Sequence, residues 1–256
     1  MAQFLPLYSS SGGNCTYIGS ASGGILIDAG VSAKRIIEAL HGAGIAPGQV
    51  GAVFVTHEHS DHIAGLRVFC ERTGVPVFAL PGTLAALERL GASTHKMDVA
   101  DLPAGGVEVN GLQVRGFPVS HDAAAPCGYR VELPDETKIG VATDTGCLLP
   151  ETREALYGCD LVMLESNHEV TMLQNGGYPY YLKRRILSDT GHLSNAACAA
   201  FLPELLRSGT ARFYLAHLSK ENNTPALAYE TAKAALTVEG AREGLDYTLC
   251  VAGAAG

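Results

Sequence analysis

The sequence predicts an α/β fold in which two sheets pack face to face with helices outside, a four-layer αβ/βα sandwich. Apolar runs of strand length alternate with segments of helical periodicity along the chain. At 256 residues and 47% hydrophobic content, the chain suits one large domain over residues 1–256. Metal-binding residue types follow the apolar runs repeatedly, at Asp28, His57, His59, His121, Asp144, His168 and His217.

The predicted strands are short runs bounded by turn signals. Asn110-Gly111 is a strong hairpin signal, and Pro134-Asp135 indicates a second hairpin. The expected strands cover residues 4–7, 15–19, 24–28, 50–55, 75–80, 107–109, 112–119, 128–132, 138–143, 161–164, 211–215 and 247–251.

The predicted helices lie between these strands and are recognised by their ends. Ser32 is an expected N-cap, and Gly44 and Gly91 are expected to end helices. The expected helices cover residues 32–43, 62–71, 83–90, 194–206 and 225–236.

Residues 53–62, with the sequence VFVTHEHSDH, are the most informative stretch of the chain. An apolar strand ends there in three histidines and two carboxylates, and an apolar pattern resumes at residue 63. A loop between a strand and a helix can direct side chains into a cleft, because the flanking elements are rigid. Imidazole and carboxylate both bind zinc-like ions, so this loop is a candidate for two neighbouring metals.

The spacing of this loop resembles the signature of the metallo-β-lactamase fold hydrolases. The resemblance implies two divalent ions, Zn or Mn, with Fe or Co also acceptable to such ligands. It implies a first metal held by His57, His59 and His121, a second held by Asp61, His62 and His217, and a bridging Asp144. Such ions lower the pKa of a shared water, which makes hydroxide available near neutral pH. His168 is an alternative to His217 as the last ligand.

The same resemblance implies roles for residues around the ligands. Asp61 is expected to hold the proton of the nucleophile as well as a metal. Asp28 is expected to orient a metal-bound histidine, with a solvated turn carboxylate as the alternative. His192 lies in a Gly-His-Leu-Ser stretch like that of phosphodiesterase members, where it would contact phosphate or protonate the leaving group. Glu165 and His168 would complete its proton relay.

Longer matches extend the resemblance to the bacterial YycJ/WalJ group, from about residue 4 to about residue 250. They include residues 7–15, 26–30, 165–168, 191–195 and 215–225. Members of that group are cytosolic and are associated with a cell-wall two-component system and with 5′-to-3′ exonuclease activity on DNA. The resemblance therefore implies a DNA exonuclease that acts through a metal-bridging hydroxide.

A basic triplet beside tyrosines is the candidate substrate surface. The residues are Lys183, Arg184 and Arg185, next to Tyr178, Tyr180 and Tyr181. They are candidates for phosphate binding and base stacking, and a solvated helix face with core tyrosines is the alternative. The net charge of -8 argues against a broad basic surface, so any DNA contact should be local. The chain is too short for an inserted CASP-type domain, which weakens a claim of large RNA substrates.

Other functions remain open from the sequence. A glyoxalase II-type thioesterase or another small-molecule hydrolase would share the ligand set. A true β-lactamase is disfavoured, because Asp144 and no cysteine stands at the bridging position, and Cys147 is too far along. A regulatory accessory protein of the two-component system would not require all seven ligands.

The remaining features concern compartment and assembly. Seven scattered cysteines without a CxxC pair, and no signal-peptide pattern, predict a reduced cytoplasmic protein. No stretch approaches the roughly 18 consecutive apolar residues of a membrane helix, so no membrane partner is expected. DNA is the expected partner, and a homodimer is left open. His41 and His95 lie in surface-like contexts and are expected to be inert.

Overall fold

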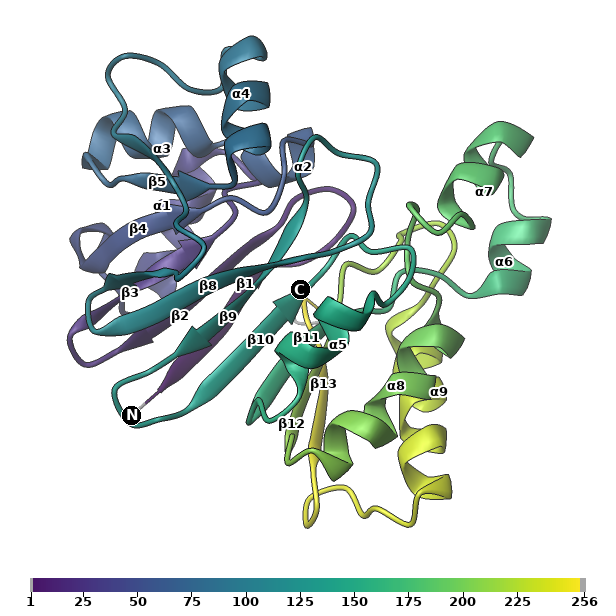
Figure 1. Cartoon of the computed structure of the whole chain (residues 1–256). Helices are drawn as coiled ribbons and strands as arrows, with labels where there is room; N and C mark the ends of the chain where they lie inside the picture. The colour runs from purple at the N-terminus through teal and green to yellow at the C-terminus, as the bar shows by residue number, and fades with distance from the viewer. Residues whose placement is uncertain (1, 254–256) are drawn as a thin grey trace. The chain divides into compact units, whose positions relative to one another are not determined.

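The computed structural model describes residues 2–253, and its chain divides into two compact units (Figure 1). Unit 1 spans Met1–Gly116 and Ala123–Thr137, and unit 2 spans Phe117–Asp122 and Lys138–Gly256. The expectation of a single domain stays a prediction. None of the described helices is long and apolar enough to cross a membrane.

Unit 1 contains a six-stranded sheet with the order β1-β2-β3-β4-β5-β6. Its strands are β1 (Gln3–Tyr8), β2 (Cys15–Ser20), β3 (Gly23–Ile27), β4 (Val50–Phe54), β5 (Val77–Ala79) and β6 (Val99–Asp101). The first three strands are antiparallel neighbours, and β3 to β6 are parallel. Because β3 and β4 are parallel, the residues that follow them emerge at the same edge of the sheet.

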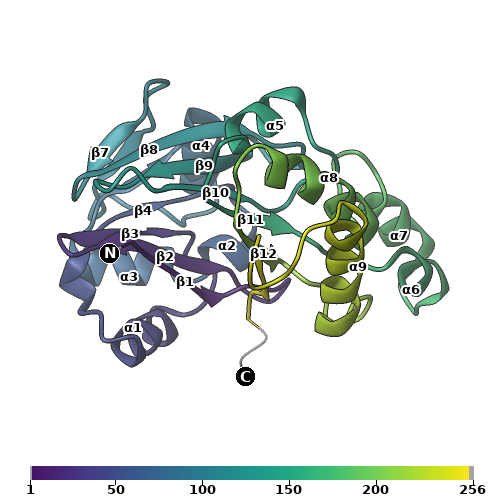
Figure 2. The same cartoon turned by 90° about the horizontal axis from the view of Figure 1, so that it is seen from below.

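The helices of unit 1 follow its parallel strands. They are α1 (Ala33–Gly42), the short 3-10 helix η1 (Pro47–Gln49), α2 (Ser60–Ile63), α3 (Leu66–Thr73) and α4 (Pro81–Arg89). Figure 2 shows α1 and α3 together on one face of the sheet. Their buried side chains Ile36, Leu40 and Phe69 join Leu26 and Val53 of the strands in one apolar core.

One predicted helix of unit 1 is interrupted. The expected helix over residues 62–71 is split into α2 and α3, with Gly65 between them. A Cβ atom at Gly65 would lie 2.0 Å from the carbonyl oxygen of Val31, so the chain passes too close for any side chain. The helical path is therefore interrupted at Gly65, shortly after the histidine loop.

Unit 1 also contains β7 (Val107–Val109), β9 (Cys127–Glu132) and all but the last two residues of β8 (Leu112–Pro118). The antiparallel pair β7 and β8 confirms the predicted hairpin. Its turn residues Asn110 and Gly111 have φ angles of 53° and 78°, as a type I′ turn requires.

Unit 2 contains four parallel strands in the order β13-β12-β11-β10. They are β10 (Lys138–Ala142), β11 (Leu161–Glu165), β12 (Arg212–Ala216) and β13 (Thr248–Val251). The helices are α5 (Pro150–Leu156), α6 (Val170–Asn175), α7 (Tyr180–Ile186), α8 (Asn195–Arg207) and α9 (Pro225–Val238). Helices α8 and α9 lie side by side in both views, and Phe201, Leu202 and Leu236 fill the core beside β12 (Figures 1 and 2).

The sequence did not predict β6, α5, α6 or α7. These elements have only 3, 7, 6 and 7 residues, which is too short for a periodic pattern to stand out. The missing helices matter, because α6 and α7 precede the loop that carries His192.

We predict that Gly30→Ala destabilises the protein. Gly30 N donates to Asn14 O at 2.7 Å, and Asn14 N donates to Asp61 O at 2.8 Å. A Cβ at Gly30 would lie 1.6 Å from Asp61 O, so the loops must separate. We expect a loss of about 1–3 kcal/mol in the free energy of unfolding, measured with urea.

Gly42→Ala is the matched control, because nothing lies within 4 Å of its added Cβ. It should change the free energy of unfolding by less than about 0.5 kcal/mol. A Gly30→Ala protein as stable as the control would contradict the close packing of these loops.

Candidate metal centre

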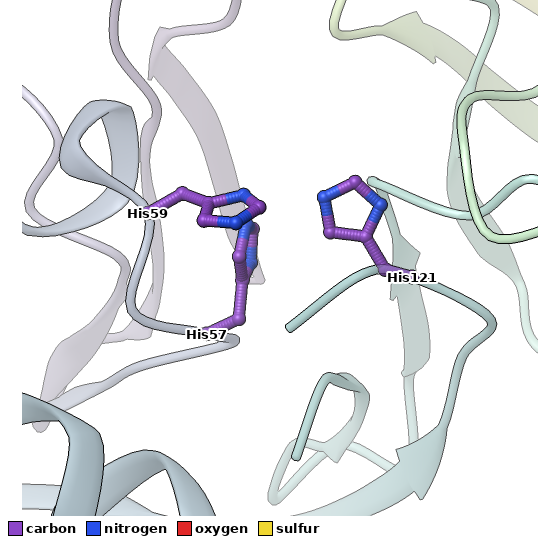
Figure 3. Close-up of side chains that lie close together, drawn as sticks. All are labelled: His57, His59 and His121. Atoms are coloured by element: carbon purple, nitrogen blue, oxygen red, sulfur yellow. The ribbon is translucent and has the colours of Figure 1, made fainter. Parts of the chain in front are cut away.

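The loop after β4 supplies a group of imidazoles in unit 1. The rings of His57 and His62 have centroids 4.1 Å apart, and those of His57 and His59 are 4.6 Å apart. Figure 3 shows the side chains of His57 and His59 rising from this loop, and it also labels His121, which follows β8. Asp61 lies on the same loop, with its Oδ2 3.6 Å from Nε2 of His62.

A buried aspartate fixes the orientation of two of these rings. Asp28 Oδ2 lies 2.8 Å from Nδ1 of His62, and a carboxylate can only accept there. Thr56 Oγ1 lies 2.9 Å from Asp28 Oδ2 and 3.0 Å from Nδ1 of His57. The hydroxyl therefore donates to Asp28 and accepts from His57. Both rings carry their proton on Nδ1, which gives Nε2 the lone pair that a metal ion needs.

Three candidate residues have a left-handed backbone at the end of a strand. The φ angles of Asp28, Asp144 and His217 are 61°, 55° and 56°, and each residue follows β3, β10 or β12 within two positions. This conformation is disfavoured for residues with a Cβ, and it turns the chain sharply where the strand stops. Strain of this kind, about 1–3 kcal/mol per residue, is typical of functional sites.

Unit 2 gathers a second group of candidate ligands. Asp144, Glu165 and His217 lie at the carboxyl ends of the parallel neighbours β10, β11 and β12, so they meet at one edge. Asp144 Oδ1 is 3.4 Å from Nε2 of His217 and 3.9 Å from Nε2 of His121. Together with His192, these residues offer ligand atoms within 4.8 Å of one another.

Glu165 organises the histidines of unit 2. Its Oε1 accepts hydrogen bonds of 2.8 Å from Nδ1 of both His192 and His217. Its Oε2 accepts from the backbone N–H groups of Thr145 and Leu193 at 2.8 and 3.1 Å. Burial acts to raise the pKa of Glu165, but the charges and hydrogen bonds of the two imidazoles lower it to about 2. The side chain is therefore an ionised acceptor with four donors.

His121 is held in the same manner. Its Nδ1 lies 3.0 Å from the carbonyl oxygen of Gly191, which accepts the ring proton. Burial lowers the pKa of His121, and the carboxylate of Asp144 opposes this shift only in part. The neutral imidazole that results is the form that binds metal.

The donor chemistry of both groups fits divalent metal ions. Five imidazoles share the pattern of an Nδ1 bonded to an oxygen, which makes Nε2 the atom that can bind metal: His57, His62, His121, His192 and His217. Mixed nitrogen and carboxylate sets of this kind suit Zn and Mn. The predicted residues therefore have the chemistry of a metal centre.

His168 differs from these residues. It is buried, and neither of its ring nitrogens has a hydrogen-bond partner among residues 2–253. Burial lowers its pKa to about 4. The possible ligand groups among the described residues include His217 and not His168, which favours His217 as the last ligand.

The predicted basic triplet lies on α7, and its members have different surroundings. Arg185 forms a two-bond ion pair with Asp122, with N–O distances of 2.5 and 2.8 Å. Lys183 donates to the carbonyl oxygen of Gln174 at 2.8 Å. Arg184 is exposed, and so are Tyr180 and Tyr181. The alternative of core tyrosines is wrong for these two residues.

Sequence reasoning assigned no role to Thr56 or Asn223. Thr56 links Asp28 to two ring nitrogens, and Nδ2 of Asn223 donates to the carbonyl oxygens of Ser166 and Asn167. Asn223 thereby clamps the loop after β11. The available signal was that Thr56 directly precedes His57 and that Asn223 lies six residues after His217.

The family of this chain is shown by comparison with known proteins. Residues 24–218 match the Beta-lactamase superfamily domain. The chain belongs to the metallo-β-lactamase fold hydrolases. The predicted fold, the enzyme class and the resemblance to YycJ and WalJ are thereby confirmed.

Two bacterial exodeoxyribonucleases are similar to this hydrolase over most of its length. It is 37% identical to exodeoxyribonuclease YycJ of Bacillus anthracis over 238 residues, which is 93% of this chain and 90% of the relative. It is 36% identical to exodeoxyribonuclease WalJ of Streptococcus pneumoniae over 245 residues, 94% and 90% of the two chains. The crystal structure of the metallo-β-lactamase fold protein YhfI from Bacillus subtilis superposes with a TM-score of 0.73 at 14% identity, covering 97% and 95%.

We predict that Asp28→Asn weakens metal binding about 10–100-fold, the usual effect of removing an outer carboxylate partner of a metal-binding histidine. The amide loses the charge and the second acceptor that hold His62 and Thr56. Competition of the hydrolase with a chromophoric zinc chelator measures the change.

Asp101→Asn is the control, because Asp101 is an exposed carboxylate that ends β6 of the same sheet. Its metal affinity should equal that of the wild type. An Asp28→Asn protein that binds zinc as tightly as this control would rule out the positioning role of Asp28.

Proposed function

We propose that this hydrolase is a 5′-to-3′ DNA exonuclease that cleaves phosphodiester bonds with two divalent ions. One observation carries the choice of bond, namely the Glu165–His192 pair. The leaving group of a DNA phosphodiester is a strongly basic sugar alkoxide, which needs a proton as it departs. A thiolate, with a pKa near 8.5, leaves without one. A positioned general acid therefore favours the phosphodiester over the thioester of a glyoxalase II-type enzyme.

The proposed ligands are the seven that the sequence predicts. His57, His59 and His121 would hold the first ion, Asp61, His62 and His217 the second, and Asp144 would bridge them. Family membership and the common Nδ1 pattern of the imidazoles support this assignment. The ions, Zn or Mn with Fe as a third option, would lower the pKa of a bound water and neutralise charge on the phosphate.

The protein side chains would then handle protons and position the substrate. Asp61, whose Oδ2 is 3.4 Å from Nδ2 of Asn14, would accept the proton of the nucleophile. His192 would give the proton of Nε2 to the leaving oxygen, since its Nδ1 is held by Glu165. Glu165 stabilises the protonated ring by remaining ionised.

The basic triplet and the cellular setting complete the proposal. Of this triplet, Arg184 is exposed and would contact the phosphate backbone of the DNA, whereas Lys183 donates to the carbonyl oxygen of Gln174 and Arg185 pairs with Asp122. The two relatives named exodeoxyribonucleases support a nucleic-acid substrate. The cytoplasm is the proposed location, and a homodimer stays a prediction.

The primary test is hydrolysis of end-labelled DNA by the purified protein with Mn or Zn. Stepwise loss of nucleotides from a 5′ end is expected, and His59→Ala should abolish it. Turnover of a hydroxyacylglutathione thioester with intact DNA would replace the exonuclease with the thioesterase. Cellular signalling that survives Asp144→Ala would favour the regulatory alternative.

We predict that His192→Ala lowers kcat for DNA about 10²–10⁴-fold, the usual contribution of a general acid. Bis(p-nitrophenyl) phosphate should be affected far less, because nitrophenolate departs without a proton. Equal losses on both substrates would exclude proton donation by His192.

A further inference from the structure

The two tyrosines that begin α7 are exposed to an unusual degree. Tyr180 is 77% exposed and Tyr181 is 74% exposed, whereas Tyr17 and Tyr129 are almost fully buried. Adjacent aromatic rings that are exposed to solvent form an apolar patch, and such patches usually mark a site where another molecule binds. Their exposure points to a binding surface.

Positive charge lies directly beside these rings. Lys183 and Arg184 follow within one helical turn, in a chain with a net charge of -8. Aromatic faces next to cations are the usual surface for single-stranded nucleic acid, because bases stack on the rings while the cations contact phosphates. Duplex DNA does not fit as well, because its bases are already stacked on one another.

Helix α7 is also joined to the candidate active site within unit 2. Its last residue, Ile186, accepts a 3.0 Å hydrogen bond from the backbone N–H of His192. Arg185 holds Asp122, the neighbour of His121. Figures 1 and 2 show α6 and α7 next to each other and extending beyond α8 and α9, so these longer helices do not cover α7. A strand bound on α7 would therefore end near the residues that act on it.

We propose that α7 is a platform for the single-stranded end of a DNA substrate. Tyr180 and Tyr181 stack on unpaired bases, and Arg184 contacts a phosphate. Arg185 has a different task, because its guanidinium is engaged by Asp122 and so positions the loop of His121. The platform rests on the proposed exonuclease function, and it refines that function to a preference for single-stranded ends.

The double variant Tyr180→Ala/Tyr181→Ala tests the platform. Binding of fluorescein-labelled single-stranded DNA in EDTA should weaken at least about 30-fold, since two base stacks are lost. With metal present, kcat/KM for single-stranded DNA should fall by a similar factor relative to that for bis(p-nitrophenyl) phosphate. Tyr180→Phe/Tyr181→Phe keeps the rings and should restore both values. Val238→Ala, at an exposed position on α9, is the control for surface substitution.

The outcomes separate the platform from the nuclease proposal. If the wild type is an exonuclease and the double alanine variant binds and cleaves single-stranded DNA equally well, the platform alone is overturned. Tyrosine-dependent binding of single strands without cleavage would support the platform and overturn the exonuclease. Unchanged DNA binding with loss of binding to phosphatidylglycerol vesicles would overturn the platform in favour of a membrane surface.

Discussion

The arrangement of histidines in unit 2 depends on the hydrogen bonds that the buried carboxylate of Glu165 accepts. A carboxylate without solvent is costly unless it is fully hydrogen-bonded, and its two oxygens here accept from two imidazoles and two backbone N–H groups. One anion thus sets the proton position of His192 and of His217 at once. In the proposed mechanism the first ring moves a proton and the second binds metal, although both rings are bonded to the same oxygen of Glu165.

A parallel constraint operates in unit 1 through Asp28. Asp28 accepts hydrogen bonds from Nδ1 of His62 and from the hydroxyl of Thr56. The same hydroxyl accepts from Nδ1 of His57 and so orients that ring. Asp28 can do this only because its left-handed backbone turns the carboxylate toward the end of β4. Asp144 and His217 show the same turn at the ends of β10 and β12. The strained strand ends and the oriented imidazoles are therefore two aspects of one arrangement.

The sequence predicted a buried strand directly before the histidine loop, and β4 confirms it. The assignment of these histidines as metal ligands stays a prediction. The sequence also predicted that His121, Asp144 and His217 end strands, since metal-binding residue types recur after apolar runs. It could not predict the bond between Thr56 and Asp28, which are 28 residues apart and meet only because β3 and β4 are parallel neighbours. Nor could it show that Tyr180 and Tyr181 are exposed, because α7 has 7 residues and too few turns to reveal a buried face.

Metal ligands alone do not select a substrate, because imidazole and carboxylate donors serve thioester, lactam and phosphodiester hydrolysis equally. Selection must come from the groups around them. In the proposed function, Glu165 and His192 provide a proton, which matters most for an alkoxide leaving group. Helix α7 presents the exposed rings of Tyr180 and Tyr181, and its Arg185 pairs with Asp122, the neighbour of His121. The residues that distinguish this hydrolase are thus the ones that connect α7 to its histidines.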